Sequence, residues 1–239
     1  MRLLPTYILS VLLLVTCLPD GLPGQITDYR DDFHSLEHWK HYKFPNVDRA
    51  TQYEITVMGK DTVLKTSSDN SASLLLLRKT FEVDSFPVLE WKWKVENIYE
   101  KGDEITKAGD DYALRIYVNF KYDPSKASLW ERTKYSVARS VFGKYPPHSA
   151  LSYIWANTEH EKRILPNPFQ EKAQMVITRE GESGVGEWHT ERVNILADYR
   201  EAFGAKPPDI ASLAIMNDSD GTGESSVSYL DYILLEPAE

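Results

Sequence analysis

A two-residue alternation of apolar and polar side chains is the clearest pattern in this sequence. In residues 88–96, VLEWKWKVE, every second residue from Leu89 is apolar and the residues between them are charged. A strand turns successive side chains to opposite faces, so the pattern predicts a strand with one buried face. Residues 111–120, DYALRIYVNF, repeat the alternation and place Arg115 and Tyr117 opposite the apolar face.

Similar short segments recur along the whole chain. They read YEITVMG, TVLKTSS, ASLLLLRKTFEV, ALSYIWAN (150–157), AQMVITRE (173–180), EWHTERVNI (187–195), IASLAIMN (210–217) and SYLDYILLE (228–236). Turn residues separate them, and about ten short strands of this kind are typical of an antiparallel sandwich or jelly roll. We therefore expect an all-β, jelly-roll-like antiparallel β-sandwich.

Two segments have helical rather than strand spacing. Residues 124–143 and 194–204 place their apolar residues near one helical face, and each is closed by a glycine with a Pro pair shortly after it. Glycine accepts the left-handed conformation that ends many helices, and proline prevents continuation. The sandwich is therefore expected to carry one or two short helical insertions.

The first 24 residues differ in composition from the rest of the chain. They combine Arg2, a short apolar run and a Pro- and Gly-rich end, which predicts a secretory signal peptide. Lipidation at Cys17 and an uncleaved anchor are the alternatives. We expect residues 25–239 to form one β-sandwich domain, exported to the periplasm or the extracellular space, without membrane insertion.

Charge and cysteine content narrow the class of partner. The net charge is −9 and stays so when residues 1–24 are removed, because Arg2 and Asp20 cancel. Such an acidic chain is a poor partner for nucleic acid. Cys17 is the only cysteine, so the exported domain has no disulfide and depends on core burial.

No catalytic motif is present in the sequence. HExxH, GxSxG, a P-loop and the E-x-D-x-x-E strand of sandwich glucanases are all missing. Carboxylates from separate strands, for example Asp111 with Glu191, still leave a hydrolase or lyase open. Enzyme activity is thus undecided, with no catalytic residue identified.

The acidic segment 215–235, IMNDSDGTGESSVSYLDYILL, raises the question of a cation site. It does not match an EF-hand, because Tyr229 stands where the bidentate Glu is needed and the flanks are strands. Asp218 and Asp220 still offer oxygen ligands for Ca²⁺. The alternative is a tight turn built by Asp and Gly through local hydrogen bonds, with no bound cofactor.

Two further stretches supply candidate binding residues. Asp110 and Asp111 precede the Arg115 strand, and a carboxylate near Arg115 would fix its guanidinium either structurally or for a ligand. In YIWAN, Trp155 and Asn157 fall on one face and suit stacking and hydrogen bonding to a sugar, although Trp155 is also a core candidate.

Five stretches in order resemble the DUF3047 family of bacterial secreted proteins of unknown function. They are WKWKV, GDDYALRIYVNF, YIWAN, EWHTERVNILADYREAFG and AIMNDSDGTGESSVSYLDYILL, within residues 28–237. The resemblance implies a jelly-roll-like sandwich and a signal peptide, and it transfers no catalytic residue. The family's loop typically reads DTDNTG, whereas this chain has DSDGTG, which removes one possible oxygen ligand.

The leading hypothesis is a non-catalytic envelope or secreted module that binds a saccharide or other polar ligand on a sheet face. The alternatives are a polysaccharide hydrolase or lyase and a scaffold that binds a protein. The residues expected to bind the ligand are Asp110, Asp111, Arg115, Tyr117, Trp155, Asn157, Asp218 and Asp220. The last two are also the candidate metal ligands.

Overall fold

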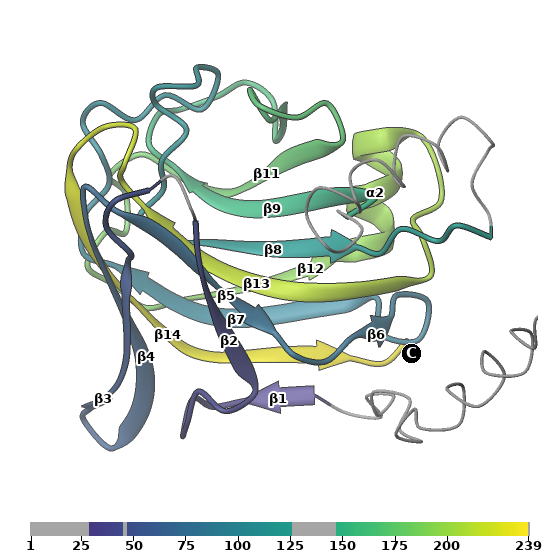
Figure 1. The fold of residues 1–239 in the computed structure, drawn as a ribbon, viewed down its shortest axis with the longest axis horizontal. Coiled ribbons are helices and arrows are strands. Elements are labelled where there is room, and N and C mark those ends of the chain that lie inside the picture. The colour runs from purple at the N-terminus through teal and green to yellow at the C-terminus, as the bar shows by residue number, and fades with distance from the viewer. Residues whose placement is uncertain (1–28, 45–46, 126–146, 239) are drawn as a thin grey trace, which may run out of the picture.

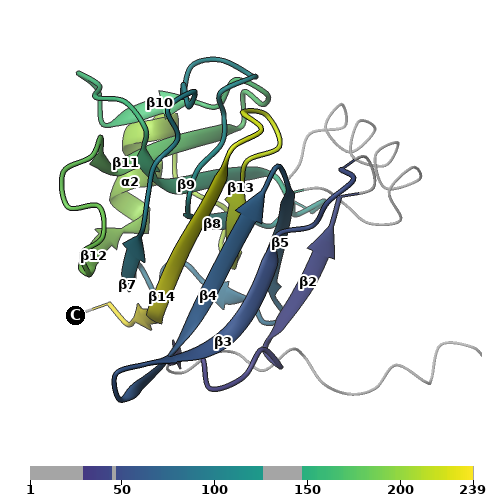
Figure 2. The ribbon, with the colours of Figure 1, turned by 90° about the vertical axis from the view of Figure 1, so that its left-hand side faces the viewer.

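Two β-sheets packed face to face form the body of the protein (Figures 1 and 2). The computed structural model describes residues 29–44, 47–125 and 147–238. The predicted signal peptide 1–24 lies outside these ranges, as does most of the predicted helix 124–143. The all-β, jelly-roll-like sandwich expected from the sequence is confirmed.

The smaller sheet has six strands. Their order is β12 (His189–Asn194), β7 (Val88–Val95), β14 (Ser225–Glu236), β4 (Asp61–Asp69) and β3 (Gln52–Met58), with β1 (Tyr29–Asp31) paired to β14. All of these pairings are antiparallel.

The larger sheet has eight strands. Their order is β10 (Ile164–Pro166), β11 (Ala173–Glu180), β9 (Ser149–Ala156), β8 (Arg115–Phe120), β13 (Ile210–Asp218), β5 (Ala72–Leu77) and β2 (Trp39–Lys43), with β6 (Phe81–Glu82) paired to β13. The pairing of β11 with β9 is parallel, which departs from the expected antiparallel arrangement.

Aromatic side chains from both sheets fill the space between them. Trp91 of β7 lies 5.5 Å from Tyr153 of β9 between ring centroids, and Trp93 lies 5.8 Å from Trp155. All four side chains are fully buried. The alternation in VLEWKWKVE therefore reports burial on the inner face of the six-stranded sheet, as predicted.

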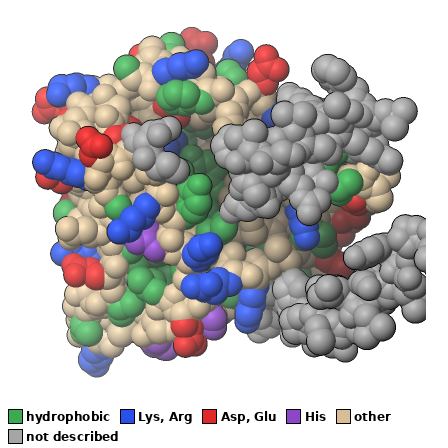
Figure 3. All heavy atoms as spheres, in the orientation of Figure 1, with side chains coloured by type: hydrophobic (Ala, Val, Ile, Leu, Met, Phe, Trp, Pro, Cys, Tyr) green, Lys and Arg blue, Asp and Glu red, His purple; other side chains and the backbone are tan. Residues whose placement is uncertain are grey.

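The larger sheet has a second, outer face. On β8, Arg115 and Tyr117 alternate with core residues, and Tyr117 is in register with Ser152 of β9 and Ala214 of β13. Hydrophobic side chains lie among Lys and Arg side chains over the surface seen in Figure 3. A small apolar cluster on the outer face is formed by Tyr112, Ile154, Ala156, Leu165 and Met175.

The predicted helix near residue 200 is confirmed as α2 (Ile195–Phe203). Asn194 caps its first turn by accepting a hydrogen bond from Ala197 N at 2.9 Å, and Gly204 ends it at φ 65°. Within the part of the chain that is described, no helix is long and apolar enough to cross a membrane.

Candidate functional site

The loops at one end of the sandwich bring together segments that are far apart in the sequence. The segments that follow β7 and β9 and the turn between β13 and β14 all lie at the left-hand end of Figure 1, which faces the viewer in Figure 2. We refer to this part of the molecule as the loop end.

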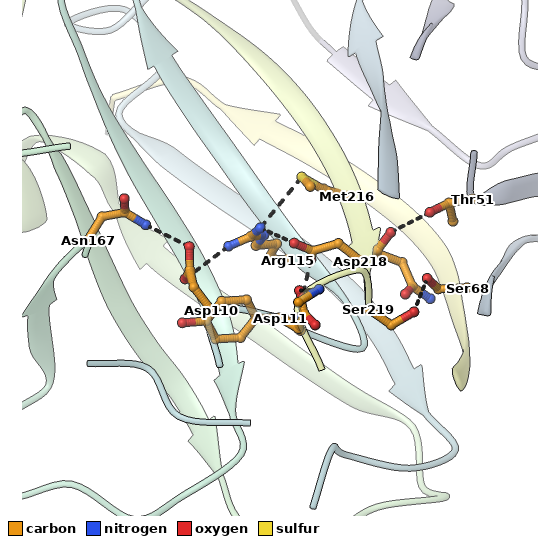
Figure 4. Close-up of polar contacts among 12 residues, drawn as sticks. Thr51, Ser68, Asp110, Asp111, Arg115, Asn167, Met216, Asp218 and Ser219 are labelled. Atoms are coloured by element: carbon orange, nitrogen blue, oxygen red, sulfur yellow. Dashed lines mark hydrogen bonds and ion pairs between the residues drawn. The ribbon is translucent and has the colours of Figure 1, made fainter. Parts of the chain in front are cut away.

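Arg115 is the centre of a buried ion-pair network at the loop end (Figure 4). Its guanidinium forms an ion pair with Asp218 through Nη2, and Nη1 lies 3.4 Å from Asp110 Oδ1. It also lies 4.7 Å above the ring of Tyr112 and 5.3 Å above that of Tyr117. Asp110, Arg115 and Asp218 have side chains that are no more than 5% exposed, so both terminal nitrogens of the guanidinium face internal partners.

Register explains why these residues meet. Arg115 is paired with Met216 across the β8–β13 ladder, so Asp218, two residues further, lies on the same outer face. Asp110 arrives from the segment that precedes β8, and its second oxygen accepts a hydrogen bond from Asn167 Nδ2 at 3.2 Å. The predicted Arg–Asp pair is therefore present, with one acid from the segment before β8 and a second from the end of β13.

Asp111 joins the segment before β8 to the β13–β14 turn. Its carboxylate accepts hydrogen bonds from Gly221 N at 3.3 Å and Thr222 N at 2.6 Å. A Cβ on Gly221 would lie 2.9 Å from Ala108 O, so a side chain there forces the two loops apart. Because Asp111 is engaged in these contacts, β8 begins at Arg115. The alternation in the sequence had predicted that it begins at Asp111.

Asp111, Asp218 and Asp220 form the acidic cluster that could hold a cation, with one oxygen of each within 4.8 Å of the others. The Asp111 oxygens already face two backbone N–H groups, and those of Asp218 face Arg115 and Tyr112 N. A Ca²⁺ ion prefers oxygens free to coordinate it and is repelled by a guanidinium. The acidic cluster therefore fits a set of hydrogen bonds that holds the two loops together, which we call the loop clasp, better than it fits a Ca²⁺ site.

Asp220 is expected to destabilise the fold at neutral pH. Asp220 is exposed at the surface, but partial desolvation by its neighbours and the charge of Asp111 raise its pKa. A carboxyl with a raised folded pKa costs no stability below its unfolded pKa and becomes destabilising as pH rises through the folded pKa. Asp220→Asn is therefore expected to raise the melting temperature at about pH 7 but not at about pH 3.

Thermal unfolding at the two pH values measures this effect, with the same scans run with and without calcium. Because the carboxylates already have donors, we expect calcium to leave the melting temperature of the parent unchanged. A calcium-dependent rise that Asp220→Asn removes would contradict the clasp and establish a metal site.

Trp155 and Asn157 do not share the outer face with Arg115 and Tyr117, which corrects the expected single binding face. Trp155 points between the sheets, is 1% exposed and donates from Nε1 to Gly181 O at 2.9 Å. Asn157 lies beyond the end of β9, where it accepts from Tyr99 N and donates to Asp111 O, each at 2.9 Å. Alternation alone does not reveal which face of a strand is inward when both faces are largely buried.

Glu104 is a buried residue that the sequence did not single out. It accepts hydrogen bonds from Asn157 N at 2.6 Å and Thr158 Oγ1 at 2.7 Å, and His160 Nε2 lies 2.8 Å away. Burial opposes its charge, yet these hydrogen bonds hold the pKa of Glu104 below its usual value. Its only signal in the sequence is a setting of polar and glycine residues, which also suits an exposed loop.

A cleft of about 560 Å³ opens beside this network. It is lined by Glu96, Asn97, Ile98, Tyr99, Glu100, Asn157, Thr158, Gly181, Glu182 and Val185. Asn157 is therefore the one predicted binding residue that reaches this cleft. Its neighbour Thr158 is exposed, whereas Glu104 lies behind both residues and fixes their positions.

Comparison with known proteins identifies the family. The model of DUF3047, described as a protein of unknown function, matches residues 37–234. The chain belongs to the DUF3047 family. A search of curated proteins gave no match.

Solved structures resemble this DUF3047 domain only distantly. A family 11 carbohydrate-binding module from a cellulosomal cellulase of Clostridium thermocellum is 11% identical, with a TM-score of 0.40 over 90% of this chain and 97% of that one. A Bauhinia forficata lectin in complex with GalNAc is 11% identical, with a TM-score of 0.42 over 89% and 99%. At this level of similarity, function has to be inferred from the residues of the chain itself.

The DUF3047 loop DSDGTG can be interpreted from its contacts. Gly221 stands where the resemblance to the family expects an asparagine, and its backbone packs directly against Ala108 O and the Asp111 carboxylate. Glycine at this position allows the backbone of the turn to pack closely against Ala108. An asparagine side chain, which a cation site could use as a ligand, would obstruct this packing.

Proposed function

We propose that this protein is a non-catalytic module that binds a saccharide or a similar polar ligand in the cleft at the loop end. The observation that carries the proposal is the cleft itself, whose volume of about 560 Å³ is within the range of small-molecule sites. Its walls combine hydrogen-bonding groups with apolar surface.

The lining matches the chemistry of a sugar. Carboxylates, amides and a hydroxyl group accept or donate hydrogen bonds to sugar hydroxyl groups, and the half-buried Ile98 and Val185 offer apolar contact to the ring. The groups come from three separate segments of the chain, so a ligand there is surrounded and not merely laid on a surface.

Internal hydrogen bonds hold the walls of the cleft in place. Tyr99 OH lies 2.6 Å from Ser226 Oγ, and Glu224 accepts from the backbone N–H groups of Glu100 and Lys101. Glu104 accepts from the backbone N–H of Asn157 and from the hydroxyl group of Thr158. Walls that are ordered before binding reduce the entropy cost of holding a ligand.

In this proposal the buried ionic residues position the loops and do not contact the ligand. Asp110, Asp111, Arg115 and Asp218 connect the segment before β8 with the β13–β14 turn, and the same segment carries Glu104 to the cleft. Trp155 supports the cleft from the core through its bond to Gly181 O, and Tyr117 packs on Arg115.

The acids considered for hydrolysis belong to separate networks. Asp111 is held by the backbone of the β13–β14 turn, whereas Glu191 of β12 accepts from Trp93 Nε1 at 3.2 Å and pairs with Arg179. We therefore favour binding over catalysis, and we propose an exported location on the basis of the signal-like residues 1–24.

A substitution that fills the cleft tests the proposal. Val185→Trp is expected to weaken binding of any glycan found on an array by at least about tenfold, because the larger side chain occupies the ligand volume. Isothermal titration calorimetry measures the affinity, and thermal unfolding confirms that the variant folds.

The matched control is Val57→Trp, which introduces the same side chain at a 67% exposed position of β3. It should leave affinity unchanged. Equal affinities of the parent and Val185→Trp would exclude the cleft as the binding site, and a folded parent that binds no glycan would count against a saccharide ligand.

A further inference from the structure

Negative charge dominates the lining of the loop-end cleft. Glu96, Glu100 and Glu182 contribute to its walls, and no Lys or Arg belongs to the described residues that line it. The carboxylate of Glu224 lies at the same rim, because it accepts the backbone N–H groups of Glu100 and Lys101.

These charges are only partly compensated. Lys94 Nζ lies 2.8 Å from Glu96, but in the described parts of the chain neither Glu100 nor Glu182 forms an ion pair. Two acids on the strands, by comparison, have lysine partners: Lys65 pairs with Glu54 and Lys92 with Asp231, each at 2.8 Å. Two uncompensated carboxylates, those of Glu100 and Glu182, thus line the loop-end cleft.

A concave surface with one sign of charge concentrates ligands of the opposite sign. Low-dielectric walls strengthen the field inside a cleft, and the net charge of −9 adds to it at low ionic strength. An acidic saccharide would be repelled here. A cationic group would form charge-assisted hydrogen bonds with Glu100 and Glu182.

We propose that the ligand of this cleft is a saccharide that carries free amino groups, bound through Glu100 and Glu182. This inference rests on the proposed function, from which we take the saccharide as the ligand. The new element is that the saccharide carries positively charged amino groups. The hydroxyl groups of the sugar contact Thr158, and its protonated amines contact the two glutamates.

Two tetrasaccharides of equal length test the inference. One is a β-1,4-linked glucosamine tetramer with free amines, and the other is its N-acetylated counterpart, which has no charge. At about pH 6, where amino groups are protonated, we expect calorimetry to show at least about tenfold tighter binding of the free amine. This preference should decline as salt is added, because screening weakens the attraction.

Substitution of the two glutamates should remove the preference. The double variant Glu100→Gln/Glu182→Gln keeps hydrogen-bonding capacity and size, so it should bind both tetramers with similar affinity. Glu54→Gln, on β3, is the matched control for charge and should retain the full preference of the parent.

The outcomes separate this inference from the proposed function. Binding of the N-acetylated tetramer or of another uncharged glycan, without preference for the amine, would overturn the charge inference and leave the saccharide module standing. Binding of spermine as tightly as the glucosamine tetramer would overturn the saccharide component. Absence of binding to every glycan tested would contradict the proposed function itself.

Discussion

Arg115→Ala is expected to lower the free energy of unfolding by about 3–5 kcal/mol. The substitution leaves Asp110 and Asp218 buried without their cation, and both carboxylates are no more than 5% exposed. Desolvation of the two acids then has no Coulombic compensation. Denaturant unfolding at neutral pH, followed by tryptophan fluorescence, measures the loss.

The pH dependence of the loss identifies its cause. Burial already raises the pKa of Asp218 and Arg115 lowers it, so removing Arg115 raises that pKa further, and the penalty grows as pH increases through and above the unfolded pKa. The difference between parent and variant should therefore shrink towards about pH 3, where carboxyl groups of the unfolded chain are largely protonated and the buried Asp218 carboxyl is neutral. A loss that is constant with pH would point to lost packing instead.

Arg49→Ala is the matched control for Arg115→Ala. Arg49 pairs with Asp69 at 3.0 Å, but the two side chains are 61% and 80% exposed. Removing an exposed pair is expected to cost about 0–1 kcal/mol. Equal losses for the two variants would contradict the central structural role assigned to Arg115.

Trp155→Ala is the second substitution for which a large effect is expected, about 3–5 kcal/mol of unfolding free energy. Trp155 packs against Trp93 in the centre of the sandwich and against the ring of His189 at 5.4 Å. Alanine leaves a cavity between the sheets and removes the hydrogen bond to Gly181 O. Denaturant unfolding measures the loss.

A sugar-stacking role for Trp155 predicts a different result. In that case the variant would keep its stability and lose ligand, because an exposed ring contributes little to the core. Trp188→Ala provides the comparison, since Trp188 is half-buried and lies 6.4 Å from the ring of Tyr229. Its truncation should cost clearly less than that of Trp155.

Most strands of this fold follow from local pattern. The apolar face of VLEWKWKVE becomes the inner face of β7, and AQMVITRE coincides with β11, Ala173–Glu180. Such segments are predictable because burial on one face imposes a two-residue period on the sequence. The predicted start of β8 was wrong by four residues. Asp111 and Tyr112 continue the alternation, but the Asp111 carboxylate accepts from Thr222 N in the β13–β14 turn and Tyr112 N donates to the Asp218 carboxylate.

The candidate site was predictable in part. A pair of acids before an Arg-bearing strand suggested an Arg–Asp pair at Arg115, which Asp110 forms, whereas only the β8–β13 register brings Asp218 to the same guanidinium. Glu104 and Glu182 had no comparable signal. Isolated glutamates in loops are common on solvated surfaces. Only the tertiary structure shows that Glu104 is buried in a hydrogen-bond network and that Glu182 lines the cleft.

The sequence by itself therefore determined the fold class, the helix α2 and the residue types available for an ion pair, because these depend on periodicity and on local capping chemistry. The tertiary structure decided that Trp155 faces the core, that Arg115 is enclosed by its own acids, and that Asn157 reaches a cleft with Glu182. Strand order and register bring these residues together across long separations in the chain. No short-range pattern encodes that distance information.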